Sequence, residues 1–500
     1  MWIYSEIHKK GMPFSFLLMR KDFPLAFTVN NRKHIRKLLG GKQMKKFIAL
    51  LLALVMVLSL AACSVEKAEE PAPAATEAPA AAPEAAPEAP AAPVAASEIT
   101  LWTYPIGNWG NQETVDALMA DFKAATGITV KVEYLDYQTG DDKVNTAIEG
   151  GVAPDVIMEG PERLVANWGA KGMMLDLSDL YTDEAKANLI PSAMADCHYN
   201  GVPYEYPLCI NAFCMGINKT VFEAADAMKY LNEETHTWNS VEDFIAAMDA
   251  VYAYTGKQVG AVFCGGQGGD QGTRELVKHL KGGSLTNPEH TEYTWNTQEN
   301  IEALTFLANW DAVEFDPSIV GGDEIALFYN GTLNVAFCWN AAQQTNPNTA
   351  NTGAGLTANG DEILYMAFPG DTTADIRLGC QNYGFGIFAN DDESKVLAAK
   401  EFIKYFCAGE GAPAAVRATN NFPADTTITG VYEGQENEAI LNDYNANMLP
   451  LAGDYYQGTT GWAEARTNWW NMLQEVGASD GSVEAITEIV NTRCDMANGK

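Results

Sequence analysis

ITLWTYPIGNWGNQETVDALMADFKAATGITVKVEYL, residues 99–135, decides the fold class of this chain. Residues 99–104 are typical of a buried strand, and residues 129–135 alternate apolar and polar side chains as a half-buried strand does. Between them, residues 111–126 place their large apolar side chains on one helical face, and Gly127 follows as a helix stop. The segment therefore predicts a strand–helix–strand unit.

The same alternation of short apolar strands and amphipathic helices continues along the chain and predicts an α/β architecture. The further expected elements are a helix over 142–149, a strand over 154–158, a helix from Pro161, and elements at 259–264, 273–281, 335–339 and 395–406. Open α/β sheets bind ligands beyond the carboxyl ends of their strands. Tyr104, Glu159 and Trp339 fall at such ends, so we expect them near a ligand.

Length and charge limit the function classes. A chain of 500 residues is long enough for two lobes of globular size. The formal net charge is −33, although residues 1–62 carry 11 Lys or Arg against two acids, so the remainder is still more acidic. Such a body is repelled by phosphates, so we expect no nucleic-acid partner. Most of the acid excess is expected to be a solvated surface.

Residues 44–62 have the features of a lipoprotein signal peptide. Met44 and two lysines precede an apolar run over 47–60, which is short for a bilayer span and typical of a signal-peptide core. Leu60-Ala-Ala-Cys63 resembles a bacterial lipobox, in which the cysteine thiol is lipidated before cleavage. We therefore expect Cys63 to be the mature N-terminus and a membrane anchor; an ordinary secretory signal is the alternative.

The segments on either side of the signal peptide are not expected to belong to a folded domain. Residues 1–43 precede a complete signal peptide, so we expect an upstream extension with translation starting at Met44; a long basic leader is the alternative. Residues 63–97 are rich in Ala, Pro and Glu, which favours an extended tether that cannot form a core.

The remaining cysteines and the histidines do not have the spacing of a metal site. None of the eight cysteines after Cys63 forms a CxxC pair, so buried thiols are favoured, and a disulfide outside the cytoplasm stays open. We expect no metal and no cofactor. The Gly-rich stretch 265–272 lacks the Gly-Lys-Ser/Thr that a phosphate-binding loop requires.

Several motifs occur in the order found in one family. These are Ile99-Thr-Leu-Trp102, Phe122-Lys-Ala-Ala-Thr-Gly-Ile128, Gly151-Val-Ala-Pro-Asp-Val-Ile157, Gly201-Val-Pro-Tyr204 and Trp462-Ala-Glu-Ala-Arg466. From about Glu98 onward the chain resembles the extracellular solute-binding proteins of carbohydrate ABC importers, including the maltodextrin-binding proteins. Each motif alone is weakly specific, whereas their order behind a lipobox is strongly specific.

The resemblance implies a two-lobed periplasmic-binding-protein-like fold of type II, in which each lobe is a sheet flanked by helices and a hinge joins them. The first lobe would hold 98–208 plus 388–436, and the second 212–384 plus 440–500, with crossings near Cys209, Gly384 and Glu438. The implied function is capture of a sugar outside the cytoplasm by a monomer. A permease of an ABC transporter is the implied membrane partner, with no catalysis by this chain.

The resemblance also implies ligand-binding positions. Glu162 and Arg163 match an acid and an arginine of the family, whereas Glu159 replaces an aromatic residue. Arg163 also has the alternative of a salt bridge with Glu162, and Glu159 that of satisfying the start of the helix at Pro161. The other implied contacts are Asn211, Asp270, Gln271, Trp339, Trp462 and Arg466. Tyr104 and Trp109 follow the first strand, and Tyr383 lies near a crossing, so we expect these three near the cleft as well.

Two other functions stay open at this stage. A surface glycoside hydrolase would use two carboxylates among Glu159, Glu162 and Asp270, although Glu159 and Glu162 are poorly spaced for opposite faces of a sugar. Alternatively, an acidic and aromatic cleft could hold a cationic solute such as a polyamine.

Overall fold

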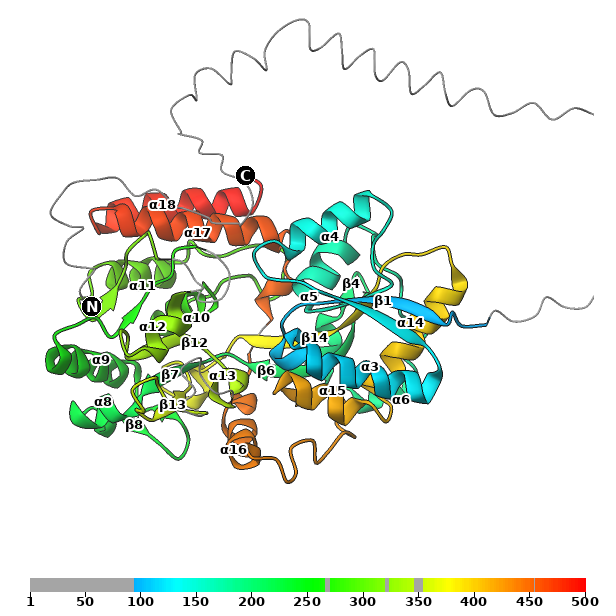
Figure 1. Ribbon diagram of the computed structural model, residues 1–500. Coiled ribbons are helices and arrows are strands. Elements are labelled where there is room, and N and C mark those ends of the chain that lie inside the picture. Colours follow the sequence, from blue (N-terminus) through cyan, green and yellow to red (C-terminus); the bar gives the residue numbers. More distant parts are fainter. Residues whose placement is uncertain (1–93, 266–269, 320–322, 346–353, 454) are drawn as a thin grey trace, which may run out of the picture. The chain divides into compact units, whose positions relative to one another are not determined.

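The computed structural model describes residues 94–500 except 266–269, 320–322, 346–353 and 454, and all of these belong to one compact unit, 90–500 (Figure 1). The predicted upstream extension, signal peptide and Cys63, and nearly all of the tether, lie outside the described residues. Within them, strands and helices form two lobes, each a sheet covered by helices. This confirms the predicted fold class.

The first lobe is built on a six-stranded sheet in the order β15-β6-β14-β3-β1-β2. The predicted strand–helix–strand unit is confirmed as β1 (Glu98–Thr103), α3 (Gln112–Thr126) and β2 (Thr129–Tyr134), with β1 parallel to β2. The Asn111 side chain caps α3 by accepting from the Thr114 N–H, and Gly127 ends it at φ 78°. The four predicted apolar residues of α3 are buried: Val115, Leu118, Met119 and Phe122.

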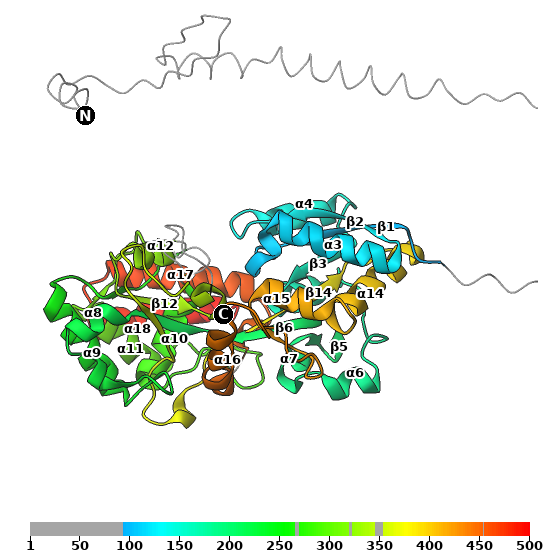
Figure 2. The ribbon, with the colours of Figure 1, turned by 60° about the horizontal axis from the view of Figure 1, so that its bottom comes forward.

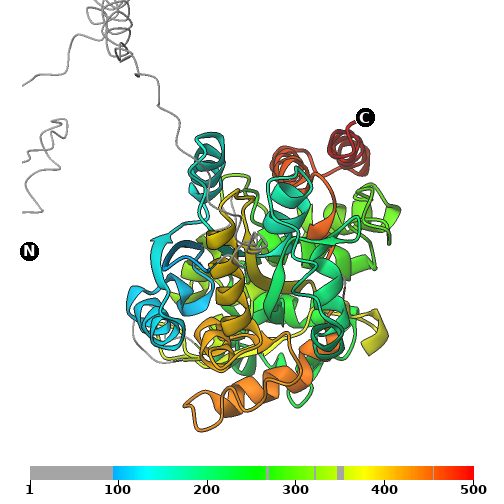
Figure 3. The same cartoon turned by 90° about the vertical axis from the view of Figure 1, so that its right-hand side faces the viewer.

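The remaining strands of this sheet come from distant parts of the chain. β3 (Val156–Glu159) is parallel to β1, whereas β14 (Cys380–Ile387) is antiparallel to both β3 and β6 (Tyr206–Ala212). The short β15 (Phe422–Pro423) closes the edge beside β6. α14 (Glu393–Cys407) contacts β1, β14 and β6, and is seen in Figure 3 beside the strands of this lobe.

The second lobe contains the antiparallel sheet β12-β7-β13 and the parallel pair β10-β11. Their bounds are Val335–Trp339 for β12, Cys214–Asn218 for β7, Ile363–Met366 for β13, Gly260–Ala261 for β10 and Val313–Glu314 for β11. α10 (Asp270–Lys281) contacts β12 and α11 (Gln298–Ala308). α17 (Trp462–Ala478) and α18 (Val483–Ala497) pack side by side at the outside of this lobe (Figures 1 and 2).

The other helices are α4 (Gly140–Glu149), α5 (Pro161–Arg163), α6 (Asp183–Asn188), α7 (Pro191–Asp196), α8 (Lys219–Ala224), α9 (Val241–Thr255), α12 (Asp323–Tyr329), α13 (Ala341–Thr345), α15 (Ala412–Thr419) and α16 (Glu438–Asn447). The other strands are β4 (His198–Tyr199), β5 (Val202–Pro203), β8 (Leu231–Asn232) and β9 (Thr237–Trp238). None of the described helices is long and apolar enough to cross a membrane.

The chain passes between the two sheets almost without a break. β6 ends at Ala212 and β7 begins at Cys214, and the intervening Phe213 N–H donates to the Gly379 carbonyl at 2.8 Å. Gly379 directly precedes β14, so two of the crossing segments lie side by side. Pairing of β6 with β14 continues to Ala212 and Cys380, beyond the crossings expected near Cys209 and Gly384.

The cysteines mostly contribute to the cores. Seven of the described cysteines are buried free thiols: Cys197, Cys209, Cys214, Cys264, Cys338, Cys407 and Cys494. Burial raises the pKa of each of these thiols, which keeps them protonated and unreactive.

Candidate ligand-binding cavity

A cavity of about 220 Å³ is lined by residues of both lobes. The first lobe contributes the turn from β3 into α5 and part of β14, and the second contributes the start of α10, the end of β12 and the first turns of α17. A second hollow of about 430 Å³ shares Tyr137, Glu162, Arg163 and Arg466 with it, and adds Trp462 and Trp470. The two hollows therefore adjoin.

The first-lobe wall carries an ion cluster centred on one arginine. The Arg163 guanidinium lies 2.7 Å from the Asp141 carboxylate, 2.9 Å from Glu162 and 3.4 Å from Glu159. Its carbon also lies over the rings of Tyr104 and Tyr137, 5.1 and 5.6 Å from their centroids. We call Arg163, Asp141, Glu159 and Glu162 the first-lobe cluster.

Burial shifts two acids on this side of the cavity, Glu159 and Glu205, toward their neutral forms. The pKa of Glu159 is raised to about 8, chiefly by burial, with the positive charge of Arg163 opposing the rise and the negative charge of Glu162 adding to it. Behind Glu159, burial also raises the pKa of Glu205, which is fully buried. Neither carboxyl oxygen of Glu205 has a hydrogen-bond partner among the described residues.

The second-lobe wall carries the opposite arrangement, centred on one carboxylate. Asp270 accepts from Arg274 at 2.5 Å and from Arg466 through two nitrogens at 2.6 and 2.7 Å. The Trp470 indole N–H donates to the same carboxylate at 3.1 Å. Burial favours neutral Asp270, but the two guanidinium groups more than offset this and lower its pKa. We call Asp270, Arg274 and Arg466 the second-lobe cluster.

Two successive tyrosines connect these clusters. The Tyr455 hydroxyl donates to the Glu162 carboxylate of the first-lobe cluster. The Tyr456 hydroxyl lies 2.6 Å from Gln271 Nε2, 3.2 Å from Arg274 Nε and 2.9 Å from Glu275 Oε1, all on α10. The segment after α16 therefore contacts both walls.

Six of the residues predicted from sequence line the main cavity: Glu159, Glu162, Arg163, Gln271, Tyr383 and Arg466. Trp462 lines the adjoining hollow, beneath the Arg274 guanidinium at 4.9 Å. Three others lie behind lining residues. Tyr104 donates to Asp141, Asn211 donates to the cavity residue Asn421, and Asp270 holds Arg466.

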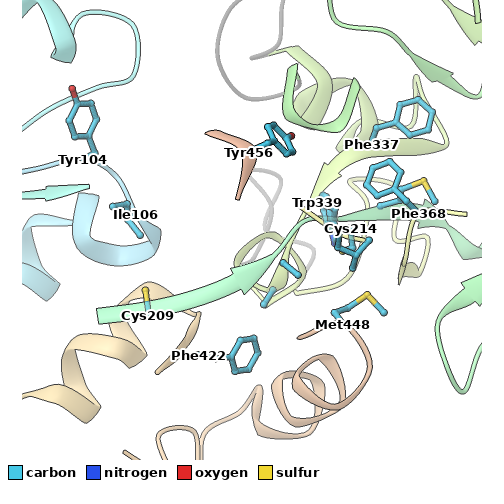
Figure 4. Packing of buried hydrophobic residues seen from close by; sticks show 14 of the residues in the cluster. Tyr104, Ile106, Cys209, Cys214, Phe337, Trp339, Phe368, Phe422, Met448 and Tyr456 are labelled. Atoms are coloured by element: carbon cyan, nitrogen blue, oxygen red, sulfur yellow. The ribbon is translucent and has the colours of Figure 1, made fainter. Parts of the chain in front are cut away.

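The structure does not bring Trp109 and Trp339 to the cavity wall. Trp109 is fully buried in the first lobe, packs edge-on against Phe385 and donates to the Ala415 carbonyl at 3.1 Å. Trp339 is fully buried among apolar side chains of the second lobe (Figure 4), and its indole N–H donates to Gln344 at 2.8 Å. Successive strand side chains point to opposite faces, so its neighbours Cys338 and Asn340 line the cavity instead.

Several lining residues escaped sequence reasoning. Tyr137 follows the carboxyl end of β2, and Asn340 follows that of β12, so the strand-end argument could have found both. Gln381 and Asn382 begin β14 at a crossing. Tyr455 and Gln457 lie in an irregular segment, for which the sequence carries no comparable signal. Within the described residues, no group of three or more His, Cys, Asp or Glu side chains is arranged to hold a metal ion.

Comparison with protein families identifies the class of this protein. The model of the bacterial extracellular solute-binding proteins matches residues 117–441, and the chain belongs to this family. The resemblance seen in the sequence is thereby confirmed. A comparison with curated protein sequences gave no significant match.

Several solved structures have the same fold. Each aligns over nearly its whole length with about four fifths of this chain. An ABC substrate-binding protein from Listeria monocytogenes in complex with cycloalternan has 19% identity and a TM-score of 0.59, covering 80% of this chain and 98% of its own. The GacH receptor of Streptomyces glaucescens, studied with acarbose, has 17% identity and a TM-score of 0.62 over 81% and 99%. The maltotriose-bound maltose/maltodextrin-binding domain of Bdellovibrio bacteriovorus has 15% identity and a TM-score of 0.60 over 80% and 99%. All three are binding proteins.

Proposed function

We propose that this solute-binding protein captures a saccharide in the cavity between its lobes and delivers it unchanged to the permease of an ABC importer. The observation that carries the proposal is the convergence of carboxylate, guanidinium, amide and tyrosine side chains from both lobes on one cavity. Charge-assisted hydrogen bonds suit the hydroxyl rim of a sugar, and rings suit its apolar face. The saccharide ligands of the three similar structures support the same class.

The proposed contacts follow from the lining. Glu159, Glu162 and Arg163 would bind from the first lobe, Gln271 and Arg466 from the second, and Tyr383 from the strand that joins them. The tryptophans of the adjoining hollow would contact a longer saccharide. The adjoining hollow of about 430 Å³ falls within the range typical of small-molecule sites, about 300–1,000 Å³, and the cavity of about 220 Å³ extends it.

Delivery requires a closed form that the permease recognises. We propose that ligand binding shifts the population toward a closed form and that the chain bends at Phe213 and Gly379. We keep the predicted division into lobes of residues 98–208 plus 388–436 and 212–384 plus 440–500, and we propose that the protein acts as a monomer. A protein of this kind needs no catalytic pair. Glu159 and Glu162 both pair with Arg163, which is unlike the two opposed carboxyl groups of a glycoside hydrolase.

Calorimetric titration with a panel of saccharides tests the proposal. We expect at least one to bind with a free energy of about 8 kcal/mol or more, corresponding to micromolar affinity, and to reduce the radius of gyration in X-ray scattering. The sugar should be recovered intact by mass spectrometry. The proposal is wrong if no saccharide binds, or if the bound saccharide is cleaved.

Membrane anchoring through Cys63 is a separate part of the proposal. The lipobox supports it, and a Cys63→Ala variant tests it in the bacterium. We expect the wild-type protein in the membrane fraction and the variant in the soluble fraction or the medium. Equal membrane association of both would exclude this anchor.

A further inference from the structure

The charges around the cavity are unbalanced on one side. In the first-lobe cluster a single guanidinium faces three carboxylates, and the buried Glu205 adds a fourth acid behind them. In the second-lobe cluster both oxygens of Asp270 are engaged by Arg466. Arg466, the second-lobe arginine that lines the cavity, is therefore held against the carboxylate of its own wall.

A second observation, independent of charge, is that a hydrogen-bond acceptor on the cavity wall has no donor. Asn382 is buried and lines the cavity, and its side-chain oxygen has no hydrogen-bond partner among the described residues. Its amide nitrogen donates to the Ala193 carbonyl at 2.9 Å, which fixes the orientation of the amide because a flip would oppose two oxygens. The Gln343 side-chain oxygen, also on the cavity wall, lacks a partner in the same way.

Glu162, Tyr455 and the backbone of Asn382 meet at the turn between β3 and α5. A Cβ placed on Gly160 would lie 2.6 Å from Glu162 Oε2, 2.8 Å from the main-chain carbonyl oxygen of Asn382 and 3.2 Å from the Tyr455 hydroxyl. On the adjacent strand, Gly384 pairs in register with Glu159, and a Cβ placed there would lie 2.8 Å from Glu205 Oε1. Acceptors and acids from three segments thus surround the end of β3.

Burying acceptors without donors, and carboxylates without matching cations, is unfavourable. A sugar hydroxyl supplies donors but no charge, whereas an ammonium group supplies three donors, one positive charge and no acceptor. Tyr137 and Tyr383 also line this part of the cavity, and a cation is favoured near the faces of such rings. The acceptors, carboxyl groups and rings of this wall are therefore complementary to an ammonium group.

We propose that the captured saccharide carries a protonated amino group, which binds against Glu159, Glu162 and the Asn382 side-chain oxygen. This inference rests on the proposed function and narrows its ligand to amino sugars. Burial raises the pKa of Glu159 to about 8, so its carboxyl group is neutral near neutral pH until a cation is bound beside it. The ammonium group supplies the positive charge that the first-lobe cluster lacks.

Matched pairs of sugars test the inference by calorimetry. The pairs differ only at one position: glucosamine, galactosamine and mannosamine, and their β-1,4-linked oligomers where available, against the corresponding hydroxyl and N-acetyl sugars. We expect an amino sugar to bind about tenfold or more tightly than both neutral partners. Equal or tighter binding of a neutral partner overturns the inference and leaves the proposed function standing. Absence of binding by every sugar overturns the proposed function itself, and binding of spermidine alone upholds the cationic site but excludes a saccharide.

A variant assigns the preference to this wall. In Glu162→Gln we expect affinity for both sugars to fall, and affinity for the amino sugar to fall about tenfold more than affinity for its hydroxyl partner. Glu464→Gln, which alters an exposed acid on α17, serves as the matched control and should keep the full preference. Both variants are first checked for wild-type circular dichroism and melting. An unchanged preference in folded Glu162→Gln contradicts the inference.

Discussion

The two walls of the cavity hold ion clusters of opposite design. In the first lobe one guanidinium, Arg163, is shared by three carboxylates at 2.7–3.4 Å. In the second, one carboxylate, Asp270, is held between Arg274 and Arg466 at 2.5 and 2.6 Å. Carboxyl groups can lose their charge by taking up protons, whereas arginine stays charged in proteins. The first-lobe cluster can therefore adapt its charge to a ligand, and the second-lobe cluster is a fixed frame.

The clusters also differ in how the chain assembles them. Glu159, Glu162 and Arg163 lie within five residues at the turn from β3 into α5, and only Asp141 comes from elsewhere. Asp270 and Arg274 are one helical turn apart on α10, but Arg466 comes from α17. The fixed cluster thus joins two helices that are distant in sequence, so its loss should affect folding most.

The largest expected effect is that of Asp270→Asn. The substitution leaves two guanidinium groups without their carboxylate, and neither can become neutral. Removing one partner of a buried ion pair costs about 3–5 kcal/mol. Urea unfolding at neutral pH measures the cost, with Asp121→Asn, an exposed acid on α3, as control. A loss below about 1 kcal/mol would mean that the second-lobe cluster is not a structural frame.

Removal of the central arginine of the other cluster should cost less. We expect Arg163→Gln to lower the free energy of unfolding by about 2–4 kcal/mol near pH 8 and by less near pH 5. Without the guanidinium the folded protein binds more protons, so its stability falls as the pH rises relative to the wild type. Arg163→Lys keeps the charge but not the geometry of the guanidinium, so its free energy of unfolding should lie between those of the wild type and Arg163→Gln. A cost that does not vary with pH would contradict the adaptable character of this cluster.

The next effect concerns how steeply the free energy of unfolding changes with pH, rather than its value at one pH. It comes from Glu159. Glu159 has a folded pKa of about 8 against an ordinary value of 4.5. Between these values the folded protein holds a proton that the unfolded chain has released, so this group lowers stability as the pH rises, by at most about 1.4 kcal/mol per pH unit. Burial is the largest cause of this shift, and the charged neighbours that modify it are Arg163, Glu162 and Asp141.

Unfolding of Glu159→Gln from about pH 5 to pH 8 tests this slope. The variant should gain stability relative to the wild type as the pH rises, because it lacks the group that titrates. Glu464→Gln should follow the wild type throughout. Parallel curves for the wild type and Glu159→Gln would place the folded pKa of Glu159 near its ordinary value.

The sequence predicts local features of this protein well and long-range pairings poorly. The unit from β1 to β2 and the residues at the start of α5 were predicted because their patterns are complete within a few turns. Trp339 was expected at the ligand because it ends a strand and matches a position of the family. All five residues of β12 are apolar, so the pattern does not show which face of the strand points to the cavity. Which face is which depends on Asn340, whose role becomes visible only in the folded chain.

The partners in long-range contacts could not be predicted from the sequence. The pairing of Asp270 with Arg466, and that of Tyr455 with Glu162, each joins residues far apart in sequence. An aromatic residue in an irregular segment has no periodicity that fixes its direction. Trp109 shows the same limit. It was expected near the cleft because it follows the first strand, but its ring fills the core.

The smallest expected effect concerns the link between the clusters. Tyr455→Phe removes one hydroxyl, which donates to Glu162, and should cost about 0.5–1.5 kcal/mol because Glu162 keeps Arg163 as a partner. Tyr456→Phe is the matched variant. Its hydroxyl has Gln271, Arg274 and Glu275 as buried partners, so we expect about 1–3 kcal/mol. Urea unfolding of the two variants under identical conditions compares the adaptable wall with the fixed one. If Tyr455→Phe proved the more costly, Glu162 would depend on that hydroxyl rather than on Arg163, and the first-lobe cluster would not be the adaptable one.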